Sequence, residues 1–178
     1  NPTPDSENNR HNIGFKIIDA INQKFSLSKQ KPKFKGLLTT GNIKGKKVYA
    51  IKPLTFMNNS GICIRELIEY FKIEAENVIV FHDDLDIDFG KIKAKFGGSS
   101  AGHNGIESID KFIGKDYSRI RIGIGKPKKN SDAVDHVLKD FDEEEIKDLK
   151  KITTNITESL SILIDKKLDL FSSTINNK

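Results

Sequence analysis

The chain has 178 residues, of which 36% are hydrophobic and 31% charged, and 30 basic against 25 acidic residues give a net charge of +5. This length fits one domain that folds without disulfides or structural metals, and the single cysteine, Cys63, excludes an intrachain disulfide and favours a reducing compartment. No apolar run approaches 18 residues, so we expect no membrane partner, whereas the mild positive charge favours an anionic one.

The N-terminal third predicts a helix followed by a hairpin. Apolar side chains recur at helical spacing over residues 12–25, which predicts an amphipathic helix. Two short apolar runs follow, at about 34–40 and 46–51, and the intervening Gly41-Asn42 and Gly45 predict a turn between two strands.

The middle of the chain predicts two more helices and two strands. Ser60 is placed to cap a helix whose apolar face extends to Phe71. Residues 78–81 form a continuous apolar run, which is typical of a strand buried on both faces. Lysines alternate with apolar residues over 91–96, which predicts a strand, and residues 103–113 have the spacing of a helix.

The C-terminal part predicts a last strand and then helices. Arginines alternate with isoleucines over residues 119–124. Asp142 and Glu145 form a capping-box pattern, and apolar residues at helical spacing continue to Phe171. Because strands and helices alternate, we expect one α/β domain over residues 1–178, with a twisted mixed β-sheet flanked by helices.

Four polar segments lie at the ends of these elements, where ligands of α/β folds usually bind. They are Asn1-Pro2 with Arg10-His11-Asn12, the run from Lys52 to Asn58, the run from His82 to Asp86, and the glycine-rich residues 97–105. They offer histidines, carboxylates and amides, but no Gly-x-Ser-x-Gly nucleophile motif is present. A histidine base with a carboxylate partner and amide donors suits attack of water on an acyl group.

Two cofactor interpretations fail on spacing. The aspartates of 84–88 resemble the start of a calcium loop, but Phe89 and Lys95 stand where that loop needs Gly and Glu. The stretch 97–105 lacks the Lys-Ser/Thr pair of a phosphate-binding P-loop. We therefore expect no metal and no cofactor, and a metal-dependent phosphoesterase built on the aspartates stays a rival that a chelator would test.

Five motifs resemble those of the bacterial peptidyl-tRNA hydrolase family. In chain order they are NP…RHNIG, KPLTFMNNSG, HDDLDIDFGKIK, GGSSAGHNGIESI and RIRIGIGKP, and together they cover the chain from Asn1 to the C-terminal helices. The resemblance implies an esterase that acts on peptidyl-tRNA, cutting the ester between a peptide or N-blocked amino acid and the tRNA 3′ ribose. It also implies a monomeric, cytoplasmic enzyme that needs no metal.

The resemblance assigns a role to each matching residue. His11 matches the general base that activates water, and Asp83 matches the carboxylate that hydrogen-bonds this base. The family's substrate-binding positions match Asn1, Ser6, Phe56, Asn58 and Asn104. Its contacts to the tRNA phosphates match Lys95 and Arg121, and we add Lys93 because it shares a strand face with Lys95. By contrast, we interpret His82 as a buried polar group and His103 as a helix-terminal or supporting residue.

The chain departs from the family pattern near its beginning. Thr3 stands where the family usually has Gly, Ser6 where it has a substrate-contacting Tyr, and Asn9 where it has Thr. Loss of the Tyr leaves room for a second hypothesis, a non-catalytic RNA-binding relative of the same fold. The family also begins with an apolar strand before the Asn-Pro pair. That strand is absent here, so we expect an N-terminally incomplete domain that lacks a central strand.

Overall fold

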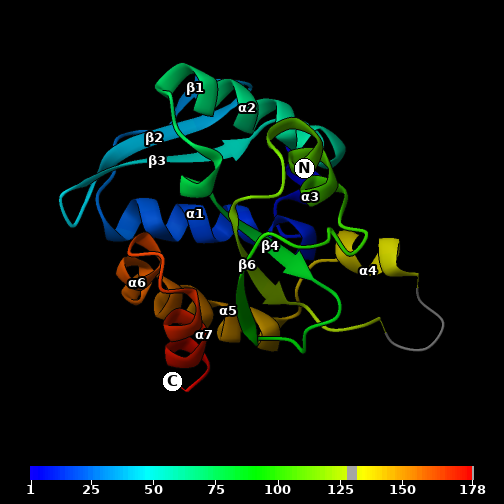
Figure 1. Ribbon diagram of the computed structural model, residues 1–178. Helices are drawn as coiled ribbons and strands as arrows, with labels where there is room; N and C mark the ends of the chain where they lie inside the picture. Colours follow the sequence, from blue (N-terminus) through cyan, green and yellow to red (C-terminus); the bar gives the residue numbers. More distant parts are fainter. Residues whose placement is uncertain (128–131, 178) are drawn as a thin grey trace.

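The computed structural model describes residues 1–127 and 132–177, and strands and helices alternate within them (Figure 1). Strands β1 to β6 span Lys31–Lys33, Gly36–Ile43, Lys46–Pro53, Ile79–Asp84, Ile92–Phe96 and Ser118–Gly123. Helices α1 to α7 span Ile13–Lys24, Ser60–Phe71, Asn104–Ile113, Ala133–Leu138, Glu143–Glu158, Leu160–Ile164 and Leu168–Asn176. The predicted α/β class is confirmed. No helix among the described residues combines the length and the apolar character needed to span a membrane.

The strands form two three-stranded sheets. In the first, the order is β1-β2-β3 and all pairs are antiparallel. In the second, the order is β4-β6-β5, with β4 parallel and β5 antiparallel to β6. The predicted mixed sheet is therefore the second one, and the predicted hairpin forms a sheet of its own because no strand among the described residues joins β3 to β4.

Two local predictions need correction. The hairpin turns at Lys44 and Gly45, whose φ angles of 50° and 76° suit a tight two-residue turn, so Gly41-Asn42 lies inside β2. Ser60 does not cap α2 but is its first residue, and its Oγ donates to the Met57 carbonyl oxygen at 3.0 Å. The chain enters α2 from a short 3₁₀ helix, Met57–Asn59, which makes a side-chain cap at Ser60 unnecessary.

The C-terminal helices confirm the predicted capping box. The backbone N–H of Glu145 donates to Asp142 Oδ1 at 2.9 Å, and that of Asp142 donates to Glu145 Oε2 at 2.8 Å. Glu145 Oε2 also accepts from Arg10 Nη2 at 2.7 Å. The start of α5 is thereby tied to the segment that carries His11.

The core lies where α1 packs between the hairpin sheet and the C-terminal helices (Figure 1). Ile13, Ile17 and Ile21 recur at helical spacing on one face of α1, and all three are buried. They belong to one large apolar cluster with residues of β6, α5 and α7. This burial, rather than local helix propensity, fixes the position of α1 and therefore of the residues just before it.

A cavity of about 600 Å³ lies between the facing edges of the two sheets. Residues of β3 and β4 line its two sides, and residues of α1, α2, α3 and α6 line the rest. In this structure β3 pairs only with β2 and β4 only with β6, so both strands expose an unpaired edge to the cavity. This explains why residues 78–81 are only half-buried, contrary to the prediction of a strand buried on both faces.

We propose that an extended strand belongs in this cavity and would join the two sheets. Two buried polar atoms on the cavity lining, Thr55 Oγ1 and His82 Nε2, have no hydrogen-bond partner among the described residues. A strand with its own backbone groups would offer partners to such atoms and to the two free edges.

We expect the stability of the protein to depend strongly on whether a strand fills this cavity. Each buried backbone group left unpaired costs about 1–3 kcal/mol, so the 178-residue chain should melt early and with little cooperativity. A protein extended by an apolar strand ahead of Asn1 should melt cooperatively at higher temperature, as circular dichroism would show. A Gly/Ser extension of equal length is the matched control. Equal melting curves for all three proteins would show that the cavity needs no strand.

Candidate active site

His11 and Asp83 meet at the carboxyl end of β4. His11 lies in a 3₁₀ helix, Arg10–Asn12, that leads directly into α1, and this turn contacts β4. Asp83 is the penultimate residue of β4. His11 Nδ1 and Asp83 Oδ1 are 2.8 Å apart. The packing of α1 thus brings together the two residues that the resemblance assigns to catalysis.

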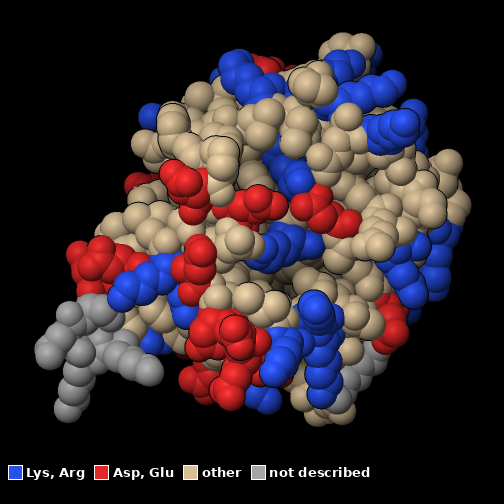
Figure 2. All heavy atoms as spheres, turned by 180° about the vertical axis from the view of Figure 1, so that it is seen from behind, with Lys and Arg blue, Asp and Glu red and all other residues tan. Residues whose placement is uncertain are grey.

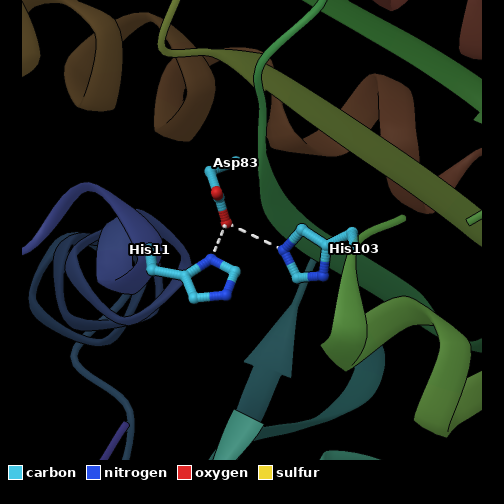
Figure 3. Close-up of side chains that lie close together, drawn as sticks. All are labelled: His11, Asp83 and His103. Carbon is cyan, nitrogen blue, oxygen red and sulfur yellow. Dashed lines mark hydrogen bonds and ion pairs between the residues drawn. The ribbon is translucent and has the colours of Figure 1, made fainter. Parts of the chain in front are cut away.

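His103 approaches the same carboxylate oxygen from the other side (Figure 3). Its Nε2 lies 2.8 Å from Asp83 Oδ1, and the rings of His103 and His11 have centroids 4.7 Å apart. His103 immediately precedes α3, where its Nδ1 accepts the backbone N–H groups of Gly105 and Ile106 at 3.1 and 3.2 Å. The sequence places His103 at a helix terminus but gives no sign of its contact with Asp83.

The electrostatics of this cluster assign the protons. Asp83 is buried, and burial alone would raise its pKa, but the imidazoles of His103 and then of His11 favour the ionised carboxylate and hold the pKa well below its usual range. An ionised carboxylate can only accept, so both imidazoles donate to it. His11 therefore carries its proton on Nδ1 and keeps a lone pair on Nε2. In His103 the proton lies on Nε2, and the lone pair of Nδ1 accepts the backbone N–H groups of Gly105 and Ile106.

His82 supports the cluster from the preceding position of β4. Its Nδ1 donates to the backbone carbonyl oxygen of Asp83 at 2.8 Å. Burial lowers the pKa of His82 to about 4, and the nearby His103 contributes to this shift. The ring is therefore neutral at physiological pH, as expected for a buried polar group at a strand end.

The buried His82 should make the protein lose stability as the solution is acidified from about pH 6.5. Its folded pKa, about 4, is below the unfolded value near 6.5, so the unfolded chain takes up this proton first. Stability is complete above the unfolded pKa and falls toward pH 4, by about 2 kcal/mol at pH 5. Urea unfolding at pH 7 and pH 5 would measure this loss, which His82→Asn should reduce. Equal losses in both proteins would contradict the assignment.

The first residues are organised by Asn12, a residue to which the sequence assigned no role. Its side-chain N–H groups donate to the backbone oxygens of Asn1 and Ser6 at 2.8 and 2.7 Å, and the residue is buried. Asn1 Oδ1 in turn accepts from the backbone N–H of Met57 at 3.1 Å. Ser6 Oγ forms a hydrogen bond with Thr3 Oγ1 at 2.7 Å. The only signal for Asn12 in the sequence is its place in the RHN motif.

Three further predicted substrate residues lie on the adjoining surface. The 3₁₀ helix that contains Asn58 contacts α3, whose first residue is Asn104, and both amides are exposed. Phe56 precedes this 3₁₀ helix and is 61% exposed. These side chains are therefore accessible to a ligand beside the His11–Asp83 pair.

The predicted phosphate contacts gather on β5 and β6. Lys93 lies directly opposite Arg121 in the antiparallel register, so both share a sheet face with the next alternate residue, Lys95. Both lysines are exposed, and Arg121 Nε donates to Asp84 Oδ2 at 2.7 Å. Seen from behind relative to Figure 1, the surface of the whole molecule carries basic side chains in separate groups, with acidic ones between them (Figure 2). An anionic partner would therefore meet discrete basic groups on this face rather than one continuous basic surface.

Arg119, on the same strand as Arg121, has a structural role. It is 2% exposed, and its guanidinium donates to Asp110 Oδ1 at 2.7 Å and to the Ser99 carbonyl oxygen at 3.1 Å. The arginine thus connects β6 to α3 and to the glycine-rich stretch 97–105. It is buried away from solvent and is not a phosphate contact.

By residue type, the cluster of His11, Asp83 and His103 could hold a metal ion, and it is the only such group among the described residues. The nitrogens that face Asp83 carry protons, however, and the other nitrogen of His103 accepts from α3. A metal would need lone pairs where those protons lie. The aspartate run is not such a group, since Asp84 bonds to Arg121 and to the backbone N–H of Asp86. The geometry thus favours a hydrogen-bonded cluster.

Comparisons with known proteins agree on one family. The family model described as "Peptidyl-tRNA hydrolase" matches residues 1–178. The peptidyl-tRNA hydrolase of Pelagibacter ubique (strain HTCC1062) is 83% identical over 178 residues, which are 100% of this chain and 96% of that protein. That of Ehrlichia canis (strain Jake) is 43% identical over 168 residues, covering 94% of this chain and 86% of its own.

Solved structures agree as well. The crystal structure of peptidyl-tRNA hydrolase from Acinetobacter baumannii superimposes with a TM-score of 0.91 at 30% sequence identity. The match covers 98% of this chain and 90% of that one. A peptidyl-tRNA hydrolase in complex with N-propanol gives the same TM-score and identity.

Proposed function

Because this chain belongs to the peptidyl-tRNA hydrolase family, we propose that it hydrolyses the ester bond between a peptide, or an N-blocked amino acid, and the 3′ ribose of tRNA. The observation that carries the proposal is the His11–Asp83 pair. The hydrogen bond of 2.8 Å leaves His11 Nε2 unprotonated, and the His11 side chain is 10% exposed at the carboxyl end of β4. A free imidazole nitrogen held by an ionised carboxylate is what a general base requires.

The proposed reaction moves one proton through His11. Its Nε2 takes a proton from a water molecule while the water oxygen attacks the ester carbonyl carbon. Asp83 stabilises the imidazolium that forms, through the hydrogen bond to Nδ1. The tetrahedral intermediate then expels the ribose oxygen, which receives the proton from Nε2. The products are the peptide carboxylic acid, which ionises by releasing its proton to solvent, and tRNA with a free 3′ hydroxyl group.

The surrounding amides supply binding and charge stabilisation. Asn58 and Asn104 are exposed on two elements that contact each other, so their N–H groups can steady the developing oxyanion or hold the substrate's 3′ end. The proposal gives Asn1, which is held by Asn12 and Met57, the role of distinguishing blocked from free amino groups. Phe56 offers an aromatic face for stacking, and Ser6 offers only a small polar contact where the family has Tyr.

Hydrolysis of N-acetyl-aminoacyl-tRNA, compared with the unblocked form, tests the function. The blocked substrate should be deacylated in single-turnover experiments while the unblocked one is spared. Binding without deacylation would instead support the non-catalytic RNA-binding alternative. Dialysis against a chelator should leave the rate unchanged, since no step needs a metal, and a loss restored by metal would favour the phosphoesterase hypothesis.

Cellular setting and assembly are part of the proposal: we expect a cytoplasmic monomer. The only cysteine, Cys63, supports a reducing compartment. It is buried, and burial raises its pKa to about 12, so the thiol stays protonated and unreactive. Light scattering over a range of protein concentrations would measure the assembly, and a mass that rises to twice that of the chain would contradict a monomer.

The basic residues of β5 and β6 should hold the tRNA phosphates. Lys95 and Arg121 lie on one face of neighbouring strands, where a point charge and a forked guanidinium can each make a phosphate contact. Because each phosphate contact contributes about one unit to the slope of log affinity against log salt, the Lys95→Ala/Arg121→Ala double variant should flatten that slope by roughly two.

The control for this prediction is a pair of exposed lysines on α5. Lys147→Ala/Lys151→Ala removes the same number of positive charges at a different surface and should leave the slope unchanged. Turnover on a minimal ester without the tRNA body should also be unchanged in the β5/β6 variant. An equal loss of rate on both substrates would show that Lys95 and Arg121 support the fold or the catalytic residues instead.

A further inference from the structure

We propose that His103 is a positioning residue that supplies a permanent N–H donor to Asp83 and thereby limits how strongly this carboxylate holds a proton on His11. The inference rests on the proposed function, because it concerns the same base. It adds His103 to the His11–Asp83 pair and gives His103 a role other than that of the base.

The start of α3 fixes the tautomer of His103. Its Nδ1 accepts two backbone N–H groups, from Gly105 and Ile106, in the first turn of α3. A proton on Nδ1 would face these two N–H groups and break the cap of the helix. The helix terminus therefore keeps Nδ1 unprotonated, so the ring's single proton lies on Nε2, which points at Asp83. Both nitrogens of His103 are occupied, and neither is available to take a proton from water.

His11 and His103 share one carboxylate oxygen of Asp83. Asp83 Oδ1 accepts from His103 Nε2 and from His11 Nδ1, each at 2.8 Å. An oxygen that accepts a second N–H has its negative charge partly neutralised, so it is a weaker partner for an imidazolium at His11. This weakening favours the unprotonated state of His11 that a general base needs at neutral pH.

Other titratable groups surround the cluster and do not make the same contact. His82 precedes Asp83 on β4, and Asp84 follows it. Glu107 lies in the first turn of α3 and is exposed. Among the described residues, only His11 and His103 donate to the Asp83 side chain from another element.

The decisive variant is His103→Asn. Asparagine is a strong helix cap, so α3 should stay intact, but its shorter side chain does not carry the ring Nε2–H to Asp83. With only one donor left, Asp83 should hold the proton on His11 more tightly. The acidic limb of the kcat/KM profile should therefore move to higher pH, by about half to one unit. Turnover at pH 7 should fall several-fold and recover at about pH 9.

The direction of this shift separates positioning from a structural role. A uniform loss of rate at every pH, with the limb unmoved, would overturn the proposal, and so would a loss as large as that of His11→Ala, which would make His103 the base. In an Asp83→Asn background His103→Asn should cause no shift, because the charge it modulates is gone. A shift that persists there would also overturn the proposal.

The tautomer can be tested on the unmodified protein, so the proposal does not depend on a variant that folds. Nitrogen NMR of ¹⁵N-labelled histidines should show neutral His103 protonated at Nε2 and unprotonated at Nδ1. A proton on Nδ1 of the neutral ring would contradict the proposal directly. Retention of substrate KM within about threefold in His103→Asn would show that the variant still binds its substrate normally.

Discussion

Replacing His11 with alanine should lower turnover of N-acetyl-aminoacyl-tRNA by about two to four orders of magnitude, the usual contribution of a general base. Of the two histidines that contact Asp83, only His11 has a nitrogen with an uncommitted lone pair, its Nε2. Binding of tRNA should persist, since the basic residues of β5 and β6 are untouched. A variant that retains more than about a tenth of the turnover would show that another group accepts the proton.

Chemical rescue sharpens this test. The His11 side chain is 10% exposed, so alanine leaves a space that solvent can reach. Added imidazole should restore part of the rate in His11→Ala, with a dependence on the concentration of its neutral form. A thermal melt of the variant should resemble that of the parent protein. Loss of both folding and rate, without rescue, would assign His11 a structural role.

The Asp83→Asn variant should also lose most of its turnover. Both histidines donate to the same oxygen, Oδ1, so an amide oxygen can accept the same two hydrogen bonds while the charge is removed. Without that charge the imidazolium loses its main stabilisation, as in other carboxylate–histidine pairs, and the rate should fall by about two to four orders of magnitude.

The pH profile of Asp83→Asn distinguishes charge from geometry. A neutral amide supports a protonated His11 less well than a carboxylate does, so the acidic limb should move to lower pH. This shift is opposite in sign to the one expected for His103→Asn. A limb that stays in place would show that Asp83 acts on the rate without direct coupling to the base.

The sequence predicts best those elements whose buried face follows from the spacing of apolar residues close together in the chain. Ile13, Ile17 and Ile21 lie on one face of a helix, so their spacing alone locates α1. The Asp142–Glu145 box is equally local. By contrast, β1 consists of exposed residues, Lys31–Lys33, and has no apolar pattern that could reveal it. Helix α4 is short, and its apolar residues are largely exposed, so it gives no periodic signal.

The candidate site shows the same division. Motifs identify His11 and Asp83 because their residue types suit a base and its partner. The double use of His103 depends on contacts with a strand twenty positions away and with the helix that follows it, and composition does not distinguish those roles. The separation of the sheets also depends on long-range packing, which explains why the apolar run 78–81 looks like a fully buried strand in the sequence.

The anchor of the His11 segment has a consequence for protein synthesis. Arg10 donates to the carbonyl oxygens of Lys139 and Asp140 at 3.1 and 2.6 Å and to Glu145 at 2.7 Å. All three partners are translated about 130 residues after Arg10. A nascent chain on the ribosome therefore carries His11 early but cannot fix its position until α5 has left the exit tunnel. The geometry of the His11–Asp83 pair is set only after α5 has been synthesised.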